Sequence, residues 1–169
     1  MKLTKKLLVL PLALIAFAIP SKSDISSFEM AVADSDGITA VGIEYSQIKS
    51  NIILSASFAT DLEEAFDINA VSLGAGYVFG DHEAGSFYAE VNYSDSDWSD
   101  AEGGLEIGWM KLGRTGTSYN FSVDDDEIVS LGMGLDLGMG RKITFGIAES
   151  TGNDLDMDTM ISIGFMAHL

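Results

Sequence analysis

Apolar side chains recur at every second position in segment after segment once the chain passes residue 24. In the segment 129–137, for example, Val, Leu, Met, Leu and Leu alternate with Ser, Gly, Gly and Asp. A period of two is that of a β-strand, whose side chains point alternately to opposite faces. Both prolines, Pro11 and Pro20, precede this region, so continuous strand pairing is permitted throughout it. The pattern predicts an all-β fold.

The alternation predicts ten strands, of which the first is the weakest. They are expected at residues 26–33, 41–45, 52–58, 69–79, 86–93, 105–111, 117–123, 129–137, 142–148 and 161–169. With both ends of the wall on one side of a membrane, the strand number must be even. We therefore expect ten strands, with eight as the alternative if the N-terminal segments merge or stay outside the wall.

The polar face of these strands is built from glycine, serine and single acids, and it holds almost no base. A soluble sandwich also alternates, but its wet face is usually richer in lysine, threonine and glutamate. Small side chains fit the crowded interior of a narrow barrel. Aromatic residues stand near the strand ends, as in the girdles of membrane barrels: Tyr45, Tyr77, Phe79, Tyr93, Trp109 and Tyr119. The expected fold for residues 24–169 is a closed antiparallel up-and-down transmembrane β-barrel.

The N-terminal residues 1–23 have the layout of a cleavable signal peptide. A basic stretch is followed by the apolar run LLVLPLALIAFAI and then by small residues. The run is shorter than the ~20 residues of a spanning helix. Cleavage is expected after Ser21-Lys22-Ser23. The alternative, after Ala16-Phe17-Ala18, is less favourable because Pro20 would lie close to the bond that is cut.

Charge is divided between two alternating classes of connection. One class is acidic: 34–37, 60–67, 94–102, 124–127 and 149–158. The other class, at 46–50, 80–85, 111–116 and 138–142, holds all five bases that follow residue 24. Alternate hairpin connections lie at the same end of a barrel, so one rim is expected to be acidic. A surplus of acids also excludes nucleic acid as a partner, because phosphate binding needs basic side chains.

The whole of residues 24–169 resembles the small outer-membrane β-barrel proteins, the porin-like superfamily that includes the transmembrane domain of OmpA. The features that carry the resemblance are the leader, the alternating strands, the short turns and the C-terminal strand MISIGFMAHL. The resemblance implies the cell outer membrane of a Gram-negative bacterium, with lipid and lipopolysaccharide as partners. It also implies recognition of the C-terminal strand by the outer-membrane assembly machinery. That strand usually ends in an aromatic residue, whereas this one ends in Leu169. On this interpretation the acidic loops are extracellular.

Few residues suggest catalysis. The chain has no cysteine, and it lacks a Gly-x-Ser-x-Gly elbow. Its two histidines, His82 and His168, are both expected at the periplasmic end, as a surface and a lumen residue. Barrel lipases and acyltransferases place their histidine at the opposite end. We expect no enzyme and no cofactor.

Four acids fall on the inward face of the predicted strands: Glu44, Glu90, Glu106 and Asp136; Glu29 is a fifth candidate. They indicate either a hydrated lumen or a water-filled path that favours small cations. In the loops, Asp154, Asp156 and Asp158 alternate and are weak candidates for binding Ca²⁺ or Mg²⁺. The leading hypothesis is a structural or surface-interaction barrel. The alternatives are a narrow cation-favouring channel and, last, a lipid-modifying barrel enzyme.

Overall fold

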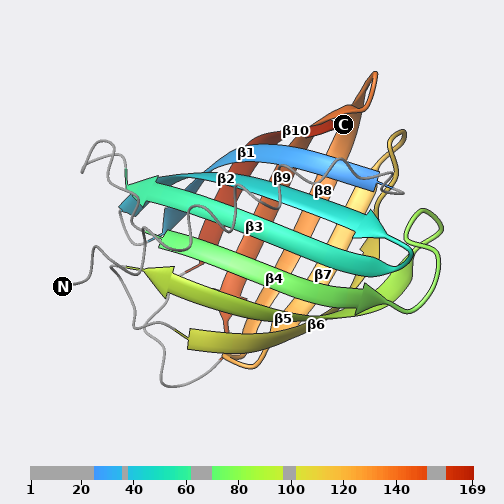
Figure 1. The fold of residues 1–169 in the computed structure, drawn as a ribbon. Coiled ribbons are helices and arrows are strands. Elements are labelled where there is room, and N and C mark those ends of the chain that lie inside the picture. The colour runs from blue at the N-terminus through green and yellow to red at the C-terminus, as the bar shows by residue number, and fades with distance from the viewer. Residues whose placement is uncertain (1–24, 36–37, 62–69, 97–101, 152–158) are drawn as a thin grey trace.

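Ten antiparallel strands form one closed barrel in the computed structural model, which describes residues 25–35, 38–61, 70–96, 102–151 and 159–169 (Figure 1). The strands are β1 (Ile25–Ser35), β2 (Ile38–Lys49), β3 (Ile52–Asp61), β4 (Ala70–Val78), β5 (Ser86–Ser96), β6 (Glu102–Lys111), β7 (Ser118–Asp124), β8 (Ile128–Gly138), β9 (Arg141–Ser150) and β10 (Met160–His168). Each pairs with its neighbours in sequence, and β1 closes the wall against β10. The prediction of ten strands is confirmed, and the eight-strand alternative is wrong.

The seam between β1 and β10 explains why the weakest predicted strand forms. Met30 lies opposite Phe165 and Val32 opposite Ile163 on one face of this pair. On its other side, β1 pairs with β2 over its whole length. A strand with a partner on each side has no free edge, so its backbone hydrogen bonds are satisfied whatever its own strand propensity.

The two ends of the barrel differ in their connections. We call "turn end" the end that holds connections 50–51, 79–85, 112–117 and 139–140, and "loop end" the opposite one. The turns 50–51 and 139–140 have two residues each, all with positive φ between 49° and 71°. This is the twist of a type I′ hairpin. Ser27 of β1 lies opposite His168 of β10, so the wall starts and finishes at the turn end.

The outward face of the wall is apolar and exposed. It carries large side chains on every strand, including Met30, Ile43, Ile52, Tyr77, Phe87, Val91, Leu105, Ile107, Phe121, Leu131, Leu135, Phe145, Ile147, Ile161 and Ile163. The described residues contain no helix long and apolar enough to span a membrane.

Large apolar side chains also point inward, and the fully packed ones gather at the turn end. They form one buried cluster, which we call the apolar floor: Ile25, Ile48, Ile53, Val78, Tyr88 and Met110, with Leu112 packed against it. Ile48 lies opposite both Ile25 and Ile53, and Val78 lies opposite Tyr88. Close packing of these side chains closes the β1–β6 side of the interior at the turn end.

Candidate functional site

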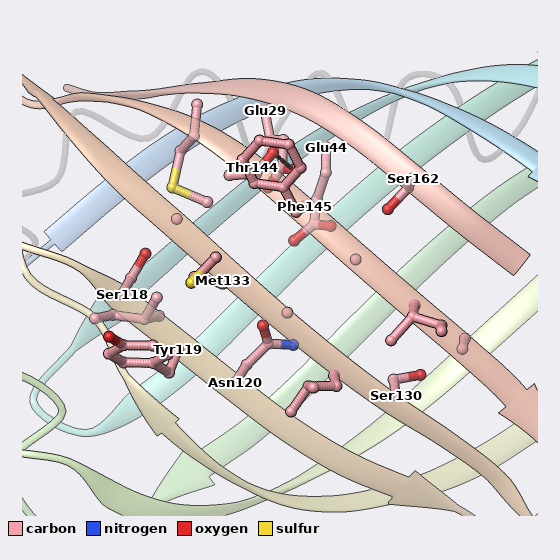
Figure 2. Close-up of a pocket in the computed structure, with 18 of the residues that line it drawn as sticks. Glu29, Glu44, Ser118, Tyr119, Asn120, Ser130, Met133, Thr144, Phe145 and Ser162 are labelled. Atoms are coloured by element: carbon pink, nitrogen blue, oxygen red, sulfur yellow. Dashed lines mark hydrogen bonds between the residues drawn. The ribbon is translucent and has the colours of Figure 1, made fainter.

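The interior above the apolar floor is hollow. Two adjoining cavities, about 520 and 330 Å³ in volume, share the lining residues Glu29, Glu44, Leu112, Asn120, Ser130 and Met166. The larger cavity rests on Ile48, Ile53 and Met110 of the floor. Figure 2 shows the smaller one, with Glu44 facing Asn120 and Ser130 across it.

Four glutamates line the larger cavity as two cross-strand pairs. Glu29 of β1 is the register partner of Glu44 of β2, and Glu90 of β5 is that of Glu106 of β6. Register partners share a face of the sheet, so both members of each pair point inward. Like charges placed directly opposite each other in a sheet destabilise it. The interior therefore carries an electrostatic cost that the packing of the wall offsets.

Hydroxyl groups from other strands bind three of these carboxylates. The Thr144 hydroxyl donates to Glu29 Oε1 at 2.5 Å, which Figure 2 shows beside Glu44. The Ser55 hydroxyl donates to Glu90 Oε1 at 2.5 Å, and the Tyr88 hydroxyl donates to Glu106 Oε1. Glu29 and Glu90 are thus tied to strands other than their pair partners, β9 and β3.

The inward base, Lys142, does not neutralise the four glutamates. Its side chain is fully buried at the turn end, where its register partner is Asp136, and it lines neither cavity. Within the part of the chain that the structure describes, the Lys142 Nζ has no hydrogen-bond partner. Residues Glu29, Glu44, Glu90 and Glu106 accordingly have no basic partner in the cavity they line.

The fourth predicted lumen acid, Asp136, does not join the glutamates. It is exposed at the turn end and accepts hydrogen bonds from the backbone N–H groups of Gly116 and Gly138, both at 2.7 Å. A register shift between Asp136 and Gly138 ends the regular pairing there. Asp136 organises two turns and lines neither cavity, so the structure does not bring it together with the four glutamates. Sequence parity identified its face, but the bulge and the turn set its surroundings.

The histidines also lie away from the cavities. His82 was expected at the surface, but it is only 8% exposed, and its carbonyl accepts the backbone N–H of Leu112 at 2.7 Å. That expectation is wrong, because the 79–85 connection folds against residue 112. His168 lies on the inward face of β10 at the turn end, as predicted. Neither residue lines either cavity.

Metal binding finds no support in the described ranges, which contain no group of three or more His, Asp or Glu side chains that could hold an ion. The candidates Asp154, Asp156 and Asp158 lie outside the described residues. What sequence reasoning missed is the apolar floor. Its signal was present, since Ile48 and Ile53 stand at inward positions among polar neighbours.

Comparisons with known proteins show only distant likenesses. No protein-family model matches the chain, and no curated protein matches it. Among solved structures, one porin variant of Rh. blastica is 20% identical with a TM-score of 0.41, covering 88% of this chain and 53% of the porin. Another is 18% identical with a TM-score of 0.40, covering 78% of this chain and 45% of the porin. The chain thus spans about half the length of these porins.

A barrel of similar size appears in the same comparison. The N-terminal β-barrel domain of Pseudomonas aeruginosa OprF is 12% identical with a TM-score of 0.39, covering 87% of this chain and 98% of that domain. The function proposed next depends on the residues of this chain alone.

Proposed function

We propose that this chain is an integral outer-membrane β-barrel whose role is structural or surface-interacting. The observation that carries the proposal is the exposed apolar outward face on a closed wall. Ile107, Leu131 and Ile161 are each more than half exposed, on three separate strands. Contiguous apolar surface of this extent is unstable in water but stable in lipid. Closure leaves no strand of the wall with an unpaired edge, which a membrane core demands.

The filled turn end favours a structural role over free diffusion. The apolar floor occupies the β1–β6 side of the interior, and buried Ser118, Lys142 and Thr144 occupy the β7–β9 side. A diffusing solute would have to displace close-packed side chains at this end. The interior therefore acts as a packed core with a hollow above it, and the loop end is left to meet other molecules.

Cell fractionation together with heat-modifiable gel migration tests location and barrel folding in one experiment. The protein should sediment with the outer membrane, and the unboiled form should migrate differently from the boiled form. Recovery of the mature chain as a soluble species, with one migration in both lanes, would contradict the proposal.

The partners that this role implies differ between the two ends of the barrel. At the loop end the acids Asp124, Asp125, Asp126 and Glu127 are consecutive. These described carboxylates form no group that could hold a metal ion. Bridging to lipopolysaccharide phosphate by Ca²⁺ or Mg²⁺ is therefore proposed for Asp154, Asp156 and Asp158 instead, since hard cations favour oxygen ligands. Residues 1–23 act as the export signal in this scheme, and β10 engages the assembly machinery. No catalytic role is proposed for His82 or His168, because neither reaches a cavity.

A cation path is the second candidate, and the two glutamate pairs in the larger cavity favour it. Carboxylate side chains lining a lumen select for cations. Single-channel recording in planar bilayers tests it. Stepwise currents with cation preference, reduced in the Glu90→Gln/Glu106→Gln variant, would support the path. Glu149→Gln is the matched control, because Glu149 is exposed on the outward face of β9. Absence of current, or anion preference, would remove it.

A further inference from the structure

We propose that Lys49, Lys111 and Arg141 bind the phosphate groups of anionic phospholipids in the membrane leaflet at the turn end. This inference rests on the proposed membrane location. All three side chains are exposed. They belong to β2, β6 and β9, so they are distributed around the wall.

Register places each of these bases on the outward face. Lys49 lies opposite Ile52, which is 52% exposed, and Lys111 lies opposite Tyr119, which is 42% exposed. Arg141 lies opposite Ala167, on the same face of β10 as the exposed Phe165. Each base is thus the last outward residue of its strand at the turn end, beyond the apolar band.

The three bases are free to meet a ligand. In the described ranges, the side chains of Lys49 and Lys111 form no hydrogen bond or ion pair, and the Arg141 guanidinium donates only to the Sδ of Met139, at 3.4 Å. The remaining two bases are committed elsewhere. Arg114 donates to the Leu169 carbonyl at 2.8 Å, and Lys142 is buried inside the barrel.

The charges at the two ends of the barrel indicate which leaflet supplies the anionic lipid. At the loop end the outward positions carry the exposed acids Asp34 and Glu149, and the described part of that end holds no base. At the turn end the described acids are Asp81 and Glu83, in the connection between β4 and β5 that contacts Leu112 beside Lys111, and Asp136 of β8. The Asp136 carboxylate accepts from the backbone N–H groups of Gly116 and Gly138. Long basic side chains can lay their stems along apolar surface and extend the charge to the headgroups. Lysine and arginine near an anionic leaflet bind its phosphates.

Tryptophan quenching can test this at a single base. Trp109 precedes Lys111 by two residues on the same face of β6. The second tryptophan, Trp98, lies outside the described residues. The barrel carrying Trp98→Phe would be reconstituted in two sets of phosphatidylcholine vesicles. One set contains brominated phosphatidylglycerol, and the other contains the same share of brominated phosphatidylcholine.

Brominated phosphatidylglycerol should quench Trp109 more strongly, with an association constant about fivefold above that of phosphatidylcholine. The preference should fall toward one in Lys111→Gln and survive in Lys111→Arg. It should also survive in the control Lys49→Gln, which removes a base on another strand. Moving the tryptophan by Trp109→Phe and Ile143→Trp reports on Arg141 in the same way, because residue 143 follows Arg141 on the outward face of β9.

The contrary outcomes distinguish a failure of the phosphate-binding role from a failure of the proposed membrane location. Equal quenching by both lipids, or a preference unchanged in Lys111→Gln, overturns the phosphate-binding role while leaving the membrane location intact. Quenching by neither lipid overturns the membrane location and this inference together.

Discussion

Glu90 of β5 and Glu106 of β6 are direct register partners, and both line the cavity inside the barrel. Glu29 and Glu44 repeat this arrangement on β1 and β2. Hydroxyl groups of Ser55, Tyr88 and Thr144 hold three of the four carboxylates. Hydrogen bonding from hydroxyls positions a carboxylate without neutralising its charge. The members of each pair therefore repel each other wherever both are ionised.

Neutralising one pair should stabilise the folded barrel. In Glu90→Gln/Glu106→Gln the amide oxygens can still accept from Ser55 and Tyr88 while the repulsion is lost. Opposed like charges cost up to about 1 kcal/mol, so the free energy of unfolding should rise by roughly that amount. Urea titration of the bilayer-inserted protein measures it, beside Glu149→Gln as control. A loss of stability confined to the double variant would contradict this account.

The apolar floor can be tested against its immediate neighbour in sequence. Ile53 is 4% exposed and points inward, whereas Ile52 is 52% exposed and points outward. Ile53→Ala leaves a cavity among close-packed side chains and should lower the free energy of unfolding by about 2–5 kcal/mol. Ile52→Ala leaves no enclosed cavity and should cost less. Equal losses in the two variants, measured by urea titration, would show that no packed floor exists.

An arginine on the outward face distinguishes lipid from water as the surroundings. Ile107 lies near the middle of β6 and is 57% exposed. In a bilayer, Ile107→Arg should lower the free energy of unfolding by about 2–4 kcal/mol, as for charges near the midplane. Tyr119→Arg, close to the turn end, should cost at most about 1 kcal/mol. A soluble protein would tolerate an arginine at both exposed positions, and that result would be inconsistent with membrane insertion.

Asp136 should matter for stability and not for ion selectivity. Asp136→Ala removes the acceptor of the Gly116 and Gly138 N–H groups, each bond being worth about 1 kcal/mol. A loss of about 1–3 kcal/mol is expected in urea titration. Asp126→Ala removes an exposed acid from the loop end and serves as control. If the lumen conducts, any change of selectivity in Asp136→Ala would return this residue to the cation path.

Strand number and side-chain direction could be predicted because both follow from local spacing. Alternation assigned Glu90 and Glu106 to the inward face, and the structure places them there. That Glu90 and Glu106 lie directly opposite each other could not be predicted from the alternation. Register depends on which residues of two strands lie opposite each other, and a slip of two positions preserves every inward or outward assignment.

The sequence by itself determined the all-β class, the division of side chains between two faces and the separation of acids from bases. These properties are periodic, so they can be read one segment at a time. Only the tertiary structure decided that Ile48 and Ile53 join Val78 in a buried floor, that Asp136 binds two turns and that His82 is buried. Those outcomes require residues from separate strands and turns to meet, and closure of the barrel sets which of them do.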